Sequence, residues 1–223
     1  MKDDLVIYSK PKGATSEALR TLRTNLQFSL IDNSKVIMIT SSIPGEGKSF
    51  ISANLAGAFS MVNKKVLLID CDLRKGRQSK IFKITDDKGL SVLLLEDIKN
   101  YKKYIHKTKI EGLDILLNGI VPPNPSELLG SAKNKDLIEL LRHEYDIIIL
   151  DCPPVSAVTD ALVLSSLADK IVIVSAYKKT PFELLNNSVK AFDQVKDKIA
   201  GVIINQIKHK SGSKYYYYDR YYQ

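Results

Sequence analysis

The sequence has only two cysteines and no apolar stretch approaching the roughly 18 residues of a membrane-spanning helix. Cys71 and Cys152 each follow an aspartate directly after an apolar run, which is typical of small core residues at strand ends rather than of a disulfide framework. The start of the chain, MKDDLVIYSK, lacks the long apolar core of a signal peptide. We therefore expect a soluble protein in a reducing cytoplasm.

Acidic residues are outnumbered, since 25 Asp and Glu face 33 Lys and Arg, for a net charge of +8. Nucleic acid, an anionic membrane surface and an acidic partner are all compatible with this excess, and a solvated face without a partner is the simplest alternative. Part of the excess is local: the segment 74–83 contains no acidic residue and carries Arg74, Lys75, Arg77, Lys80 and Lys83. We call residues 74–83 the basic segment.

Short apolar runs alternate with helical patterns along the chain, at 36–40, 66–70, 113–117, 147–150, 171–175 and 201–205. Near-continuous apolar runs are typical of parallel strands covered by helices on both faces. The pattern predicts an α/β fold with a doubly wound, mostly parallel sheet.

Several helices are predicted between these runs. One covers 49–62, and another runs from 180 to about 196, with Thr180 as N-cap, Pro181 in the first turn and Glu183 completing a capping box. The proline-rich segment 121–131 leads into a helix that ends near Tyr145.

The two ends of the chain differ from its middle. Leu19, Leu22, Leu26 and Leu30 recur at helical spacing and predict an amphipathic helix over 15–30. The last residues, SGSKYYYYDRYYQ, show no apolar periodicity. We expect an N-terminal extension at 1–14, one domain at 15–207 that begins with the helix 15–30, and a flexible tyrosine-rich tail at 208–223.

The segment SSIPGEGKS at 41–49 lies between a predicted strand and a predicted helix, which is the context of a P-loop. Gly45 and Gly47 let backbone N–H groups face phosphate oxygens, Lys48 reaches the β and γ phosphates, and Ser49 binds magnesium. The common pattern has glycine where this chain has Ser42. We predict binding of ATP with Mg²⁺ by the segment Pro44, Gly45, Glu46, Gly47, Lys48, Ser49 and Phe50.

Three aspartates follow predicted strands. Asp70 and Asp72 end VLLIDCD, and Asp151 ends DIIILD, the position of a Walker B carboxylate. Each alone could be a helix cap or a loop residue, but ligands of open α/β sheets bind at the carboxyl ends of the strands. With Lys48 these aspartates form the predicted catalytic set, and with Ser49 the predicted metal set. Asp70 or Asp72 is left to accept a proton from a nucleophile.

The tail supplies the predicted nucleophile, because six of the 11 tyrosines lie there: Tyr215, Tyr216, Tyr217, Tyr218, Tyr221 and Tyr222. Tethered hydroxyls have a high effective concentration at a neighbouring active site. We hypothesise trans-autophosphorylation between subunits. An aromatic tail used only for protein or nucleic-acid contact is the alternative.

Together these residues resemble the bacterial tyrosine kinases of capsular and exopolysaccharide synthesis. The motifs SSIPGEGKS, LLIDCDLR and IILDCPP are similar to that family's Walker A, A′ and B motifs, within the deviant-Walker P-loop proteins that include partition and division ATPases. Glu17, Arg20 and Arg23 match the family's E-x-x-R-x-x-R motif, which is associated with ring-shaped oligomers. A surface row of ion pairs would explain that spacing equally well.

The resemblance implies particular roles for the site residues. Lys48 and Ser49 would bind nucleotide and magnesium, Asp70 would act as base towards tyrosine, and Asp72 and Asp151 would support the metal. The basic segment would receive a partner's acidic or phosphorylated tail.

The resemblance also implies partners and a location. The short form of the family lacks membrane helices and depends on a membrane-embedded polysaccharide co-polymerase as activator, which recruits it from the cytoplasm to the inner face of the plasma membrane. Self-association into a ring and a cognate tyrosine phosphatase are further expected, with no nucleic acid. The process controlled would be capsule or exopolysaccharide synthesis and export.

Other classes of protein compete with this interpretation. A positioning ATPase of the division or partition type shares the fold and the aspartates, but its signature lysine is replaced here by Ser42. A metabolic enzyme of the same superfamily and a basic nucleotide-sensing module that binds DNA or membrane are weaker alternatives. The sensing module leaves the aligned aspartates unexplained.

Overall fold

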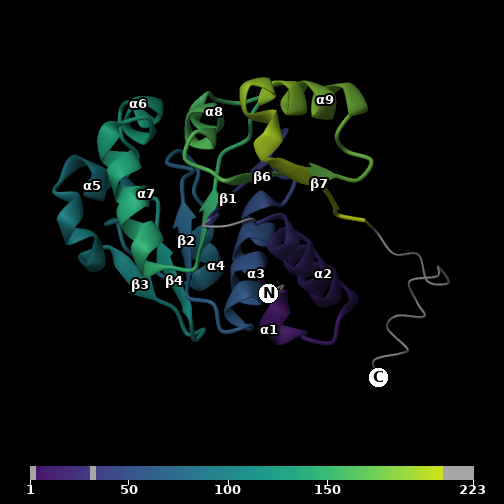
Figure 1. Cartoon of the computed structure of the whole chain (residues 1–223), viewed down its shortest axis with the longest axis horizontal. Coiled ribbons are helices and arrows are strands. Elements are labelled where there is room, and N and C mark those ends of the chain that lie inside the picture. Colours follow the sequence, from purple (N-terminus) through teal and green to yellow (C-terminus); the bar gives the residue numbers. More distant parts are fainter. Residues whose placement is uncertain (1–3, 31–33, 208–223) are drawn as a thin grey trace.

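A computed structural model of the chain describes residues 4–30 and 34–207, which are built around a seven-stranded sheet (Figure 1). Its order is β3-β4-β2-β5-β1-β6-β7, and every neighbouring pair is parallel except β3 with β4. The strands are β1 Val36–Ser41, β2 Val66–Asp70, β3 Ile105–Lys107, β4 Leu113–Leu116, β5 Ile147–Asp151, β6 Lys170–Ala176 and β7 Ile199–Asn205. The predicted fold class is confirmed.

Helices cover both faces of the sheet, which explains why β1, β2, β4 and β5 are buried along their whole length. One face packs against α1 Val6–Ser9, α2 Ala14–Ser29, α3 Lys48–Ser60 and α4 Gln78–Phe82. The other packs against α5 Leu90–Leu95, α6 Pro125–Leu129, α7 Ala132–Glu144, α8 Asp160–Ser165 and α9 Phe182–Lys190. Two 3-10 helices complete this side, η1 Ile98–Lys103 and η2 Asp193–Lys198.

All six predicted strands are present, and the predicted helices 15–30 and 49–62 correspond to α2 and α3. The helix expected to end near Tyr145 is α7, which ends at Glu144. Cys71 and Cys152 are buried free thiols, as predicted. The short edge strand β3 was not predicted, because its sequence, IHK, forms no apolar run.

The predicted helix 180–196 is wrong in two respects. Pro181 is the N-cap residue and no side chain caps the helix, because the hydroxyl of Thr180 bonds the carboxylate of Glu46 instead. The helix also ends at Lys190, and η2 follows it as a separate element. Phe192, which is 1% exposed, enters the core between the two elements, so burial of this side chain takes precedence over continuation of the helix.

The described part of the segment 1–14 packs on α3. Ile7 is fully buried, and Asn54 of α3 accepts from its backbone N–H at 3.0 Å while donating to the carbonyl of Asp4 at 2.7 Å. The hydroxyl of Tyr8 lies 2.8 Å from that of Ser60 at the far end of α3. The six tail tyrosines lie outside the described residues. Among helices within 4–30 and 34–207, none is long and apolar enough to cross a membrane.

Candidate active site

Three adjacent strands bring the predicted motifs to one edge of the sheet. In the order β2-β5-β1, Asp70 ends β2, Asp151 ends β5, and the P-loop follows β1. The parallel register pairs Asp70 with Asp151, and Asp151 with Ile39. The carboxyl ends of parallel strands therefore assemble the site.

The P-loop owes its conformation to two glycines. Gly45 and Gly47 have φ of 82° and 94°, in the left-handed region that other residues rarely adopt. A Cβ on Gly47 would also lie 2.2 Å from the side-chain nitrogen of Asn205, which donates to the carbonyl of Glu46 at 2.8 Å. The end of β7 thus rests directly on the loop that precedes α3.

The side chain of Glu46 is turned away from the pocket and braces the P-loop against β6. It is fully buried and accepts from the backbone N–H groups of Ile43 at 2.8 Å and Ala176 at 2.9 Å, and from the hydroxyl of Thr180. Only the backbone of Glu46 is left for a nucleotide. The segment 44–50 was predicted as one binding loop, and the structure divides it into groups that face the pocket and a structural brace.

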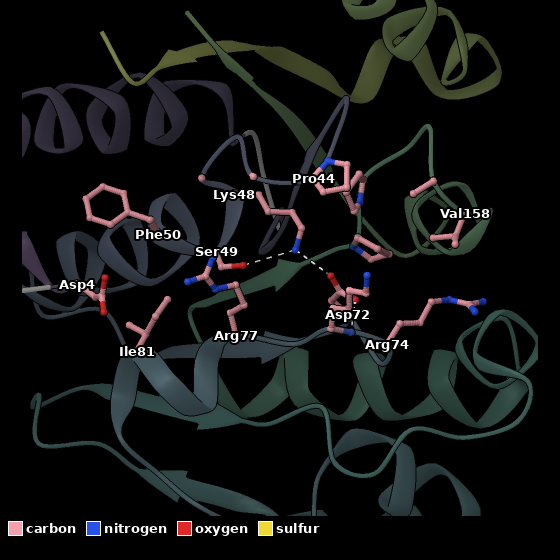
Figure 2. Close-up of a pocket in the computed structure, with 16 residues that line it drawn as sticks. Asp4, Pro44, Lys48, Ser49, Phe50, Asp72, Arg74, Arg77, Ile81 and Val158 are labelled. Atoms are coloured by element: carbon pink, nitrogen blue, oxygen red, sulfur yellow. Dashed lines mark hydrogen bonds and ion pairs between the residues drawn. The ribbon is translucent and has the colours of Figure 1, made fainter. Parts of the chain in front are cut away.

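Figure 2 shows the side chain of Lys48 reaching towards Ser49 and Asp72 at the base of the site. Its Nζ is 3.1 Å from Asp72 Oδ2 and 3.7 Å from Asp151 Oδ1, and 3.5 Å from the Ser49 hydroxyl. Burial lowers the pKa of Lys48, but the charges of Asp151, Asp72 and Asp70 outweigh burial and raise this pKa above its ordinary value. The lysine therefore stays positively charged beside the position of a phosphate group.

Asp70 is fully buried beneath these groups. Its oxygens accept from the backbone N–H groups of Asp72 at 3.2 Å and Gln78 at 3.0 Å. Burial, followed by the charge of Asp151, raises the pKa of Asp70 to about 8. Asp70 thus has the chemistry of a proton acceptor close to neutral pH.

Gln78 joins these carboxylates and was not among the predicted site residues. Its side-chain nitrogen donates to Asp151 Oδ2 at 2.8 Å and to the carbonyl of Ser49 at 3.1 Å. The residue is fully buried, and within the described parts of the chain its side-chain oxygen has no hydrogen-bond partner. Its only signal in the sequence was an uncharged amide among five basic residues.

A cavity of about 440 Å³ opens above the site, a size typical of small-ligand pockets. Its lining includes the predicted residues Pro44, Gly45, Gly47, Lys48, Ser49, Phe50 and Asp72. Asp70 and Asp151 lie beneath the lining and do not form it. The lining also contains Asp4, Arg74, Lys75, Arg77, Ile81, Pro153, Pro154, Ala157 and Val158.

The oxygen donors at the base of the cavity suit magnesium. Among residues 4–30 and 34–207, no group of three or more His, Cys, Asp or Glu side chains could hold a metal ion. Mg²⁺ in phosphate sites takes one or two carboxylates and completes its shell with substrate phosphates and water. Ser49, Asp72 and Asp151 supply such donors, and a cation beside Asp151 would offset the repulsion that raises the pKa of Asp70.

The residues predicted for oligomerisation lie on α2 but differ in their surroundings. Glu17 and Arg20 form an ion pair of 2.8 Å within the helix, with side chains 44% and 30% exposed. Arg23 turns inward, and its guanidinium donates to the carbonyl of Ala58 near the end of α3 at 3.2 Å. Arg23 therefore has a structural contact within the subunit.

Comparison with known proteins places this site in a family. A family model described as AAA domain matches residues 34–206. The chain is 40% identical over 219 residues to the tyrosine-protein kinase YwqD of Bacillus subtilis. The aligned region covers 98% of this chain and 92% of that protein. This chain is a bacterial tyrosine-protein kinase. The putative tyrosine-protein kinase CapB of Staphylococcus aureus is 35% identical over 96% of this chain and 94% of the length of CapB.

Solved structures agree with the assignment of this chain to the tyrosine-protein kinases. The kinase domain of the Escherichia coli tyrosine kinase ETK superposes with a TM-score of 0.87 at 32% identity, over 95% of this chain and 83% of that one. The septum site-determining protein MinD of Pyrococcus horikoshii has a TM-score of 0.64 at 23% identity, which shows a shared fold alone. Both the TM-score and the sequence identity are therefore higher for the tyrosine kinase domain than for the positioning ATPase.

Proposed function

We propose that this kinase transfers the γ-phosphoryl group of ATP, with Mg²⁺, to tyrosines of its own tail, and that this reaction regulates capsular or exopolysaccharide synthesis. The contact of Lys48 with Asp72 and Asp151 at the base of the cavity carries the proposal, because it combines a phosphate-binding cation with the oxygen donors of a metal. The acceptors proposed are Tyr215, Tyr216, Tyr217, Tyr218, Tyr221 and Tyr222.

Each group has one task in the proposed reaction. The P-loop N–H groups and Lys48 bind the β and γ phosphates, while Ser49, Asp72 and Asp151 would hold Mg²⁺. When bound, Mg²⁺ neutralises charge that develops on the phosphate oxygens. The tyrosine oxygen forms a bond to the γ-phosphorus as the bond from that phosphorus to the ADP oxygen breaks.

We assign the proton of the tyrosine hydroxyl to Asp70. A general base works best when its pKa lies near the working pH. Burial and the charge of Asp151 raise the pKa of Asp70 to about 8 without a bound cation, and a cation beside Asp151 would lower this pKa from that value while burial still raises it. Asp72 faces the cavity and already contacts Lys48, so it is better placed to orient the phosphates and the metal.

Transfer in trans within a ring is the proposed route, supported by the E-x-x-R-x-x-R motif and by the partial exposure of Glu17 and Arg20. Transfer in cis is the competing route. Gln206, directly before the last described residue, donates to the carbonyl of Gly45 at 2.8 Å, so the described part of the chain ends beside its own P-loop.

Two partners are proposed from the family to which the chain belongs. A membrane-embedded co-polymerase would activate the kinase and recruit it to the inner face of the plasma membrane, and a tyrosine phosphatase would reverse the reaction. Loss of membrane association on deletion of the activator gene, measured by cell fractionation, would support recruitment. Unchanged association would contradict it.

The test of the main proposal is incubation of the purified full chain with ATP and Mg²⁺, followed by mass spectrometry of the tail. The incubation is done with and without the cytoplasmic segment of the activator. Phosphotyrosine in the cluster is expected, and it should be absent from Lys48→Met. Unmodified tyrosines under both conditions would overturn the proposal.

A second incubation decides the route. Lys48→Met chains with an affinity tag are mixed with untagged wild type, and the tagged tail is recovered. Phosphate on the tagged tail supports transfer in trans. An unmodified tagged tail beside a modified wild-type tail would show transfer in cis.

A further inference from the structure

β7 forms one edge of the sheet, beyond β6 (Figure 1). Within residues 4–30 and 34–207, no strand pairs with its outer side. Whereas β1, β2, β4 and β5 are buried along their whole length, β7 alternates between exposed and half-buried residues. Val202 is 40% exposed and Ile204 is 46% exposed. The strand therefore presents apolar side chains to solvent at an open edge.

The same two residues direct their backbone groups away from β6. The carbonyl of Asn205 accepts from the N–H of Tyr177, directly after β6, at 2.8 Å, so the polar groups of Asn205 face that strand. The N–H and C=O groups of successive residues in a strand point to opposite sides, so those of Ile204 and Val202 point to the open edge. Such a row of backbone donors and acceptors is a template for an added strand.

Edge strands are normally protected against such pairing, and β3 at the other edge of the sheet shows how. It has three residues, of which two are His106 and Lys107. β7 has seven residues, and the segment 199–207 contains neither a charged residue nor a proline. A bulge at Ala200 interrupts the first part of β7. The regular part of the strand, residues 202–205, has no protection of this kind.

The tail is an occupant that the chain itself supplies. β7 is the last element and the described residues end at Ile207, so residues 208–223 are tethered at the end of the open edge. Tethering gives a high effective concentration, whereas a second copy must be collected from solution. Residues 215–218 are four consecutive tyrosines, which prefer strands and match the uncharged residues 202–205 in length. The preceding sequence SGS at 211–213 is typical of a turn.

We propose that the tail docks on the open edge of β7, with residues 215–218 as an added antiparallel strand beside residues 202–205. The tyrosine rings cover Val202 and Ile204, because aromatic and β-branched side chains pair favourably across strands. An antiparallel strand runs back from the carboxyl end of the sheet, so the docked tyrosines lie away from the cavity. Docking is thus a resting position, which the tail leaves before a tyrosine reaches a γ-phosphate by either route.

A phosphate group on the tail would oppose this docking. It adds about 1.5 to 2 negative charges, and the segment 199–207 offers no cation to pair with them. Removing water from such a charge at an apolar edge is unfavourable. The docking itself needs no phosphoryl transfer, and only its reversal by the kinase reaction rests on the proposed function.

The test of docking is amide hydrogen exchange at Val202 and Ile204, measured by NMR on the full chain without nucleotide. Wild type is compared with Tyr216→Pro/Tyr217→Pro, because proline cannot donate to a neighbouring strand. Two consecutive substitutions place one proline opposite β7 in either register. Exchange should be about tenfold faster in this variant than in wild type, since a few cross-strand pairs hold the tail.

A matched control moves the same change out of the proposed strand. Tyr221→Pro/Tyr222→Pro removes two tyrosines and adds two prolines beyond residue 218. Exchange at Val202 and Ile204 should stay within about twofold of wild type in this chain, because the proposed strand is intact.

The effect of charge is measured without kinase activity. Tyr216→Glu/Tyr217→Glu and Tyr216→Gln/Tyr217→Gln both remove two rings, but only the first adds negative charge. Exchange at Val202 and Ile204 should be at least about threefold faster in the glutamate chain than in the glutamine chain.

Three outcomes would overturn the inference. Equal exchange in wild type and in Tyr216→Pro/Tyr217→Pro would show that the tail does not cover β7. Protection that falls on dilution would assign the edge to a second copy rather than to the chain's own tail. Equal exchange in the glutamate and glutamine chains would remove the effect of charge. Absence of phosphotyrosine from wild-type tails incubated with ATP would reject the proposed function alone, since none of these exchange measurements depends on it.

Discussion

The side-chain amide of Gln78 donates a hydrogen bond to Oδ2 of Asp151 at 2.8 Å. The same amide donates to the carbonyl of Ser49, and the backbone N–H of Gln78 donates to Asp70. One uncharged residue thereby joins the P-loop helix to the ends of β2 and β5. The relative positions of the predicted metal and base residues depend on it.

Gln78→Leu should lower the phosphorylation rate by about 10- to 100-fold, as is typical for loss of a group that orients metal ligands. The free energy of unfolding should fall by about 1–3 kcal/mol, because Asp151 loses a buried donor. Steady-state rates and urea denaturation measure the two effects. Asn134→Leu is the control, since it removes a buried amide that bonds Leu129 far from the site. Equal effects of both substitutions on the rate would contradict a positioning role.

Gly47→Ala should weaken ATP binding by at least about tenfold, because the left-handed backbone strains a residue with a Cβ by about 1–2 kcal/mol and this Cβ would strike Asn205. The variant Gly47→Ala/Asn205→Ala removes the collision but not the strain. Partial recovery of affinity, measured by isothermal titration calorimetry, is therefore expected. Full recovery would show that φ at residue 47 is unimportant.

The stability of the protein without nucleotide should depend on pH through Asp70. Burial and the charge of Asp151 raise its pKa from 3.8 to about 8, so between these values the folded chain holds a proton that the unfolded chain has lost. The contribution of this group to stability therefore falls as pH rises through the window. Asp70→Asn abolishes the titration, so the variant should gain stability relative to wild type between about pH 5 and about pH 8. Parallel pH profiles in urea denaturation would contradict the raised pKa.

Glu17→Ala and Arg23→Ala should separate self-association from folding. Arg23 donates to a carbonyl near the end of α3, so its loss should cost about 1 kcal/mol of unfolding free energy. Glu17 forms a partly exposed pair within α2, so its loss should cost about 0.5 kcal/mol or less. Both should weaken self-association in analytical ultracentrifugation. An unchanged association constant for Glu17→Ala would remove this residue from the proposed interface.

Much of the fold could be predicted from local patterns. The apolar runs of β1, β2 and β5 are continuous because both faces of the sheet are covered, and the leucine spacing of α2 follows its packing on α3. The failure at 180–196 has a tertiary cause. A capping box is favourable in isolation, but the buried carboxylate of Glu46, far away in sequence, needs the hydroxyl of Thr180 as a donor.

The candidate site was predicted from residues that belong to short, recognisable motifs, such as Lys48 in the P-loop and the aspartates at strand ends. Gln78 was missed because an uncharged amide among five basic residues does not by itself indicate burial. Its role arises only when α4 packs over the ends of β2 and β5. In the same region Lys75 and Arg77 line the cavity, whereas Lys80 and Lys83 do not.

The sequence by itself determined the α/β class, the P-loop and the three aspartates, because hydrophobic periodicity and glycine-dependent turns are local properties. The tertiary structure decided which of these groups face the cavity, which brace it and which lie beneath it. The physical reason is that burial and the pKa of a carboxylate depend on neighbours from distant segments. Asp70 and Asp72 stand two residues apart in sequence, yet only Asp72 lines the cavity, and Asp70 is buried beside Asp151 with a raised pKa.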